Sequence, residues 1–155
     1  MNLGDKITDS AFKTTHNPCA HFSDFAGKWL ILYFYPKDAT PGCTLEGQDF
    51  RDAYAEIRAL NAEVLGVSRD SLTSHEKFKC NQSFPFELVS DDEEHLCQLF
   101  DVIKMKNLYG KQVRGIERST FLIDPEGVLR KEWRKVTVKG HVLEVIDALT
   151  TCSKA

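Results

Sequence analysis

The residue in this sequence best suited to chemistry is Cys43, which follows Thr40, Pro41 and Gly42 where an apolar run gives way to a helical pattern. The first turn of a helix carries unpaired backbone N–H groups and the positive end of the helix dipole. Both favour a thiolate, which is the nucleophilic form of cysteine. No second cysteine stands at Cys-x-x-Cys spacing from Cys43. The pattern therefore predicts a single nucleophilic thiol rather than an ordinary dithiol carrier.

The residues just before Cys43 are typical of a tight passage from strand to helix. Pro36 ends the apolar run because it has no N–H to give to a strand partner. Thr40 is predicted as the helix N-cap with its hydroxyl also on the thiol side, and Pro41 suits the first helical position. Gly42 lets the backbone come close to whatever binds there.

A strand, a helix and a second strand are predicted around this turn, at residues 29–35, 43–60 and 63–68. Short connections between them indicate a βαβ unit with a right-handed crossover and parallel strands. This arrangement places Cys43 at the carboxyl end of its strand, where open α/β sheets hold their ligands.

The remaining elements extend this α/β pattern. Residues 2–28 suggest a strand or hairpin anchored by Ile7 and Phe12. Residues 104–115 suggest a basic, turn-containing loop, which we interpret as solvated surface. The alternative is that this loop borders the active site. The other predicted segments are helices at 71–80, 95–102 and 141–151, a strand at 86–89, and two strands at 119–124 and 128–138 around a Pro-Glu-Gly turn. Cys152 then falls in a mobile tail. The order of elements predicts a thioredoxin-like fold, with a central mixed β-sheet flanked by helices and an N-terminal extension.

The chain has 155 residues, of which 42% are hydrophobic, so one domain spanning residues 1–155 is expected. Its formal net charge of −3 gives no electrostatic case for binding nucleic acid or an anionic membrane. There is no apolar run long enough to span a bilayer, and the first residues lack the build of a signal peptide. We therefore expect a cytoplasmic protein.

The five cysteines form an odd set at irregular spacing, which argues against a disulfide-stapled scaffold. A metal site is one interpretation of His16, Cys19 and His21, which lie within six positions. A fourth ligand at the spacing of a zinc finger is missing, so we favour a surface loop and expect no metal or cofactor. Cys97 lies among apolar residues and is interpreted as core.

Pro36, Thr40 and Cys43 together spell P-x-x-x-T-x-x-C, which resembles the active-site signature of the peroxiredoxins. The surrounding YFYPKDATPGCTLEG is similar to the bacterioferritin comigratory protein or peroxiredoxin Q branch, and the likeness continues through HEKF…FPFELVSD, GIERSTFLIDPEGVLRKEWRKV and the terminal helix. This resemblance implies a thioredoxin-like, monomeric thiol peroxidase. Such an enzyme reduces hydrogen peroxide and organic hydroperoxides through a sulfenic acid on Cys43, with thioredoxin as electron donor.

The resemblance also implies roles for single residues. Arg118, in ERSTF, would contact the sulfur and the peroxide, and Thr40 and the N–H of Cys43 would help to hold the peroxide. Pro36 is counted with the site as a member of the signature. Glu46 would orient Arg118, although it also fits as a favourable acid near the helix start.

The branch implies a resolving cysteine either five residues after Cys43, where this chain has Gln48, or near Cys80. Cys80 is thus the leading candidate, to attack the sulfenic acid and form an intramolecular disulfide. Cys97 or a one-cysteine mechanism remains open, and a half-buried structural cysteine is the alternative for Cys80. A thiol-disulfide carrier or a metal-binding module would leave Thr40 and Arg118 unexplained.

Overall fold

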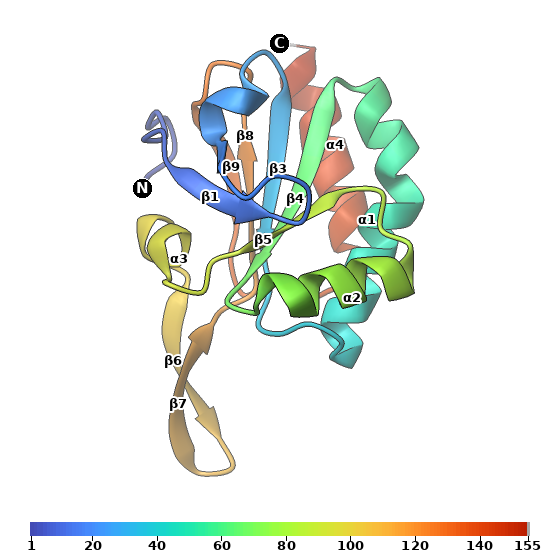
Figure 1. Cartoon of the computed structure of the whole chain (residues 1–155). Coiled ribbons are helices and arrows are strands. Elements are labelled where there is room, and N and C mark those ends of the chain that lie inside the picture. Colours follow the sequence, from blue (N-terminus) through green and yellow to red (C-terminus); the bar gives the residue numbers. More distant parts are fainter. Residues whose placement is uncertain (155) are drawn as a thin grey trace.

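The computed structural model describes residues 1–154 (Figure 1). Its elements, in chain order, are β1 (Ala11–Thr14), β2 (Ala20–His21), the short 3-10 helix η1 (Phe22–Phe25), β3 (Trp29–Phe34), α1 (Pro41–Ala59), β4 (Ala62–Ser68), α2 (Leu72–Gln82), β5 (Glu87–Ser90), α3 (His95–Leu99), β6 (Ile103–Leu108), β7 (Lys111–Ile116), β8 (Ser119–Ile123), β9 (Leu129–Trp133) and α4 (His141–Ser153). None of the helices in this part of the chain is long and apolar enough to cross a membrane.

Strand β3 is the centre of the fold. It pairs in parallel with β4 and antiparallel with β8, and all six of its side chains are buried. Successive side chains of a strand point to opposite faces, so a strand covered on both faces must be apolar throughout. This is why the predicted strand lacks a polar alternation.

Seven strands form a mixed sheet in the order β2-β1-β5-β4-β3-β8-β9, which confirms the predicted mixed architecture. Strands β3 and β4 pair in parallel, as the βαβ pattern predicted, and β4 also pairs in parallel with β5. The N-terminal hairpin of β1 and β2 extends the sheet beyond β5, and β9 forms the other edge.

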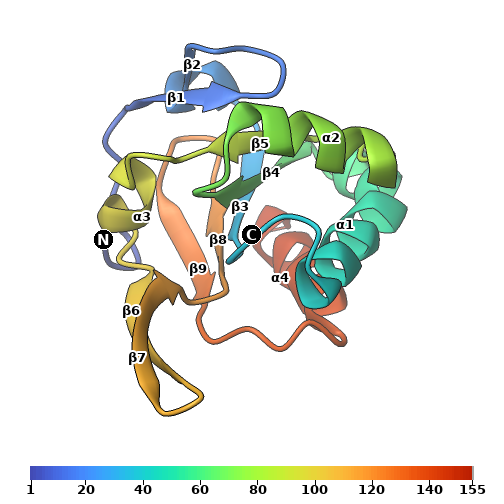
Figure 2. The ribbon, with the colours of Figure 1, turned by 60° about the horizontal axis from the view of Figure 1, so that its bottom comes forward.

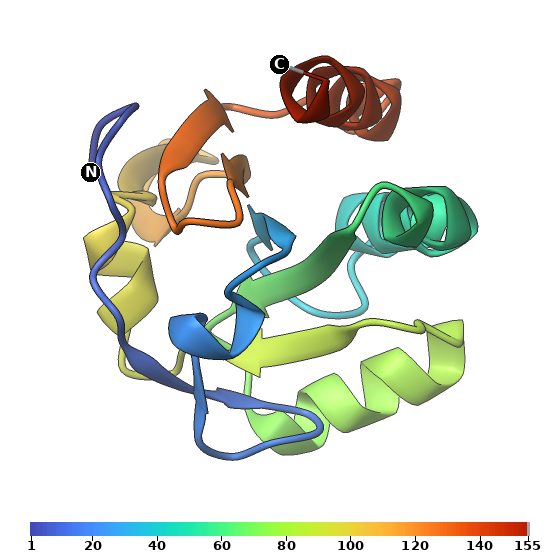
Figure 3. The same ribbon diagram turned by 90° about the horizontal axis from the view of Figure 1, so that it is seen from above.

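Two apolar layers cover the sheet. Ile31 and Tyr33 of β3 pack with α1, α2 and α4, whereas Leu32 and Phe34 face the side of β1, η1 and α3. Figure 3 shows α1 and α4 on one side of the sheet and the N-terminal segment with α3 on the other. The alternation along one strand therefore builds both layers.

Three predicted boundaries are wrong. Helix α3 ends at Leu99, where residues 95–102 were expected, and Asp101 has a positive φ of 53° that a helix cannot contain. Strand β9 ends at Trp133, shortly before Lys135 at φ 50°. Helix α4 continues to Ser153, so Cys152 is helical and packs against the core rather than lying in a mobile tail. Cys152 follows Leu149 by three residues and so shares its apolar face.

The predicted loop at residues 104–115 is also wrong, because this segment forms the antiparallel hairpin β6–β7. Its two-residue turn consists of Tyr109 and Gly110, both at positive φ, which is the backbone of a hairpin turn with the twist that strands favour. Tyr-Gly is an unusual sequence for this turn, so its signal was weak. The hairpin is separate from the seven-stranded sheet and projects from one end of the molecule (Figure 1).

Candidate active site

The loop from β3 to α1 lies at the end of the molecule from which the hairpin β6–β7 projects (Figure 2). Tyr35 extends the pairing of β3 by donating its N–H to the carbonyl of Val67 at 3.0 Å. Pro36 follows and has no N–H to donate, so the chain leaves the sheet as predicted. Ala39 then adopts a positive φ of 61°, which turns the chain toward α1.

The start of α1 leaves Cys43 in the third helical position. Thr40 has the extended backbone of an N-cap, and the first bond of the helical ladder runs from the Thr44 N–H to the Thr40 carbonyl at 2.8 Å. The Cys43 N–H precedes that ladder and belongs to the donors a helix start leaves for other partners. The predicted side-chain cap is wrong, because the Thr40 hydroxyl donates instead to the carbonyl of Lys37 at 2.8 Å.

Arg118 is the cation at the Cys43 sulfur. It lies between β7 and β8, and the register of β3 with β8 pairs Phe34 with the adjacent Ser119. This brings the Arg118 Nη2 atom to 3.3 Å from Cys43 Sγ, to which it donates. Cys43 is only 2% exposed. A Cβ atom on Gly42 would lie 3.2 Å from the same Nη2, so glycine leaves room for the guanidinium.

Glu46 occupies the other side of the guanidinium. Its Oε1 accepts from Arg118 Nη1 at 2.6 Å, and its side chain is fully buried. Its Oε2 has no hydrogen-bond partner among the described residues. Burial raises the pKa of Glu46 from 4.5 to about 7, against the opposing effect of the Arg118 cation. Burial also works to lower the pKa of Arg118, but Glu46 and Cys43 raise it, and the net shift is upward. The guanidinium therefore stays charged.

Two buried groups beside this site were missed by the sequence reasoning. Burial raises the pKa of Tyr33 well above its ordinary value, with Glu46 and Cys43 adding to the effect, and its hydroxyl has no partner among the described residues. Burial and the Arg118 cation lower the pKa of His141 to about 4, and its Nε2 lies 2.8 Å from the hydroxyl of Thr120. Tyr33 therefore stays protonated and His141 neutral at pH 7.

Lys106 of β6 is a third group near the site. Its ammonium donates to the carbonyl of Ile116, two residues before Arg118. Burial lowers the pKa of Lys106, and Arg118 lowers it further, whereas Cys43 raises it. Lys106 thus contacts the backbone close to Arg118, which favours the alternative that residues 104–115 border the active site. No local signal distinguished this lysine from its neighbours.

A buried polar cluster fixes the loop before α1 to the start of α2. Asp38 accepts from the Tyr35 hydroxyl, the Ser74 hydroxyl and His75 Nδ1, each at 2.7 Å. The Asp38 N–H donates to Asp70 at 3.0 Å. These contacts hold the active-site loop against two other segments, and the sequence offered no sign of them.

Within residues 1–154, one group of side chains has ligand atoms close enough to one another to hold a metal ion: Asp38, Asp70 and His75. Their ligand atoms are already engaged by hydrogen bonds, so the group reads as structural. The sequence-based metal hypothesis concerned His16, Cys19 and His21, which do not form such a group in this part of the chain.

The cysteines other than Cys43 lie in different surroundings. Cys80 is exposed near the end of α2, and Cys19 is exposed in the turn after β1. Cys97 is buried, as predicted, and burial with the nearby Asp91 raises the pKa of its thiol far above the usual range. A thiol so raised remains protonated and unreactive. All five cysteines are free thiols in this structure.

Known proteins resemble this chain over nearly all of its length. The AhpC/TSA family model matches residues 3–132. The peroxiredoxin Bcp of Bacillus subtilis is 50% identical over 154 residues, covering 99% of this chain and 98% of that protein.

Solved structures show the same likeness. A serine mutant of Xylella fastidiosa PrxQ has a TM-score of 0.94 and 45% identity, and covers 99% of this chain and 98% of its own. The bacterioferritin comigratory protein of Xanthomonas campestris, a protein described as having alkyl peroxide reduction activity, has a TM-score of 0.89 and 47% identity, and covers 96% of this chain and 99% of its own.

The fold and these relatives define a thiol-dependent peroxidase with a thioredoxin-like fold, as expected from the resemblance. The chain belongs to the AhpC/TSA family, and within it to the Bcp or peroxiredoxin Q group.

Proposed function

We propose that this chain reduces hydrogen peroxide and organic hydroperoxides to water and alcohols, with Cys43 as the nucleophile. The observation that carries this proposal is the fork of Arg118, which donates to the Cys43 sulfur with one nitrogen and to Glu46 with the other. A planar guanidinium holds two separate nitrogens in a fixed arrangement, one for each partner, whereas a lysine offers a single nitrogen. The alkyl peroxide activity of the Xanthomonas campestris relative supports the organic substrates.

In the proposed reaction the Cys43 thiolate attacks one peroxide oxygen and the O–O bond breaks. The attacked oxygen and its proton remain on sulfur as the sulfenic acid, and the other oxygen leaves as hydroxide or alkoxide and takes up a proton. The leaving oxygen develops negative charge, and we assign its stabilisation to the N–H of Cys43, to Arg118 and to the Thr40 hydroxyl, which would first have to leave the Lys37 carbonyl. Arg118 contacts the sulfur, and Thr40 and Cys43 belong to the N-cap and the first turn of α1.

We assign positioning roles to Glu46 and Pro36. The 2.6 Å contact between Glu46 and Arg118 limits the rotation of the guanidinium, so its second nitrogen stays directed at the sulfur. Pro36 ends the pairing of β3 and so sets where the loop toward Thr40 begins.

We propose further that Cys80 resolves the sulfenic acid, forming a Cys43–Cys80 disulfide with release of water. The end of α2 lies against α1, because the Gln48 amide donates to the Gln82 side chain and Arg51 to the Gln82 carbonyl, both at 2.9 Å. Cys80 is two residues before Gln82. Thioredoxin would then return two electrons by thiol–disulfide exchange.

The disulfide requires a conformational change, because Cys43 is buried and Cys80 exposed. Bridged cysteines need Cα atoms within about 7 Å of each other. Helix α2 is suited to such a change, since only His75 and Phe78 of its 11 residues are buried. Segments with few buried contacts open at low free-energy cost. Local unfolding of the end of α2 is thus part of the proposed cycle.

The experiment is mass spectrometry of the protein after one equivalent of hydrogen peroxide, digested without reductant. A linked peptide pair containing Cys43 and Cys80, absent from Cys43→Ser, is expected. Cys80→Ser should lose thioredoxin-driven turnover, whereas Cys97→Ser and Cys152→Ser, the matched controls, should keep it. Full turnover by Cys80→Ser would refute its role, and no oxidation of Cys43 would refute the whole proposal.

We also propose that residues 1–155 act as one monomeric domain in the cytoplasm. The two apolar layers, which cover the faces of one sheet, support the single domain. Sedimentation velocity over a range of protein concentrations tests the monomer.

A further inference from the structure

The hairpin β6–β7 carries charge of one sign. Between Ile103 and Ile116 it contains Lys104, Lys106, Lys111 and Arg114, and no acidic residue. Taking these four from the 20 basic residues leaves 16 against 23 acidic ones, so the rest of the chain has a net charge of −7. The hairpin is therefore a positively charged arm on an acidic body.

The strand register divides the hairpin into two faces. Lys106 is paired with Val113, Leu108 with Lys111, and Lys104 with Gly115, and directly paired residues lie on the same side. We call the face formed by Lys104, Lys106, Leu108, Lys111 and Val113 the docking face. It combines three cations with two exposed apolar side chains, since Leu108 is 54% and Val113 41% exposed.

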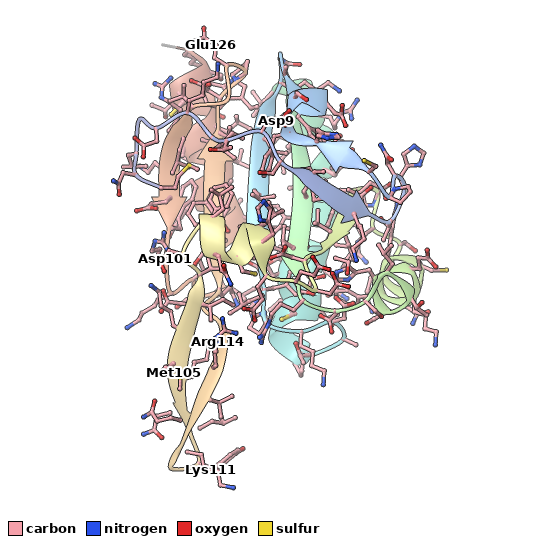
Figure 4. All side chains as sticks on the ribbon, turned by 60° about the vertical axis from the view of Figure 1, so that its left-hand side comes forward. Asp9, Asp101, Met105, Lys111, Arg114 and Glu126 are labelled. Carbon is pink, nitrogen blue, oxygen red and sulfur yellow. The ribbon has the colours of Figure 1, made fainter. Side chains whose placement is uncertain are left out.

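The opposite face fixes the hairpin to the body. Arg114 donates with both terminal nitrogens to Glu94, which also accepts from Arg69 at 2.9 Å. Figure 4 shows Arg114 nearer the body of the molecule and Lys111 at the far end of the hairpin. The arm is thus held in position at its base while its tip stands free.

The docking face leads from the tip to the active site. Lys106 reaches from this face to the body, because its ammonium donates to the carbonyl of Ile116, two residues before Arg118. A partner lying along this face would therefore reach the surroundings of Cys43. Tyr109, at the tip, is 97% exposed and extends the apolar contact available to such a partner.

We propose that the docking face binds the protein dithiol that reduces the oxidised enzyme, and that this partner is acidic, with apolar side chains around its thiols. This inference rests on the proposed function, in which a disulfide must be reduced from outside. One partner thiolate would attack the Cys43–Cys80 disulfide and release one cysteine as thiolate. The second partner thiol then releases the other, leaving the partner oxidised by two electrons.

Charge complementarity favours this occupant. A body of net charge −7 repels an acidic protein, so the arm offers the attractive approach and directs the partner to the site. The same body would oppose an anionic membrane. Pairing of two hairpins would bring their lysines together, and cations on strand edges discourage such pairing.

The test compares Lys104→Glu/Lys111→Glu with the control Lys28→Glu/Lys131→Glu, which changes the net charge equally at exposed positions away from the hairpin. Peroxide consumption is measured with dithiothreitol and with an acidic thioredoxin, its reductase and NADPH. In the hairpin variant the KM for thioredoxin should rise roughly tenfold or more, with weaker salt dependence. Its rate with dithiothreitol should not change, and the control should match the wild type in both assays.

An unchanged KM for thioredoxin in the hairpin variant would overturn the docking face. If the hairpin variant lost binding to phosphatidylglycerol vesicles while its thioredoxin kinetics stayed unchanged, the docking face would instead bind a membrane. If it lost a concentration-dependent dimer with unchanged thioredoxin kinetics, the face would instead bind a second copy of the chain. Failure of the proposed function is a separate result, because the wild type would then consume no peroxide even with dithiothreitol.

Discussion

Replacing Glu46 by glutamine should raise the free energy of unfolding relative to the wild type, and this gain should be larger at neutral pH than at acidic pH. The carboxyl is fully buried and its pKa is raised to about 7, against 4.5 in an unfolded chain. At about 1.4 kcal/mol per pKa unit, this difference corresponds to a penalty of up to about 3 kcal/mol for burying the ionised form. Glutamine keeps an oxygen for Arg118 but cannot ionise.

The pH window follows from the direction of the shift. Below pH 4.5 both folded and unfolded states hold the Glu46 proton, and the penalty is absent. Between pH 4.5 and about 7 the unfolded state releases its proton first, so wild-type stability falls as pH rises. Above pH 7 the penalty is complete. The free energy of unfolding of Glu46→Gln minus that of the wild type should therefore increase by up to about 3 kcal/mol from pH 4 to pH 8.

Urea denaturation of both proteins, kept reduced, at intervals from pH 4 to pH 8 measures this difference. Other titrating groups are common to both proteins and largely cancel in the subtraction. A difference that stays flat, or that decreases with pH, would show that the Arg118 ion pair keeps Glu46 ionised throughout. The burial argument would then be refuted.

Arg118→Lys should lower kcat/KM for hydrogen peroxide by about a hundredfold or more, because an ammonium has one nitrogen and lacks the fixed fork that reaches Cys43 and Glu46. Stopped-flow competition kinetics measure this loss, and a loss below about tenfold would contradict the fork argument. Gly47→Ala should destabilise the fold by about 1–3 kcal/mol in urea denaturation, since its Cβ would lie 2.3 Å from the Phe84 ring, and an unchanged midpoint would show that the ring moves freely. The wild type should lose up to about 2 kcal/mol of stability as pH falls from 6.5 to 4, because His141 binds a proton in the unfolded chain but not in the folded one. His141→Gln should not show this loss. Equal pH dependence of the unfolding free energy in both proteins would contradict the lowered pKa.

The sequence by itself determined the elements whose causes are local. An apolar run, Pro36 and a helix-start pattern at Thr40 and Cys43 lie within a few residues of one another, and local backbone preferences are enough to predict a thiol at the start of a helix. The fold class followed from the order of strands and helices, because each of these elements is predicted from residues close together in the chain. The contact between Glu46 and Arg118 was expected from family resemblance alone, since the local sequence marks Glu46 only as an acid near a helix start and does not mark Arg118.

Only the tertiary structure decided how distant segments meet. Arg118 is 72 positions from Glu46, and the pairing of β8 with β3 brings the two together. Lys106, on a hairpin with an unusual turn, donates to the Ile116 carbonyl near Arg118, and His141 of the terminal helix packs against Phe50 of α1. Neither placement is encoded near those residues, because burial and electrostatic shifts depend on packing between elements far apart in the chain.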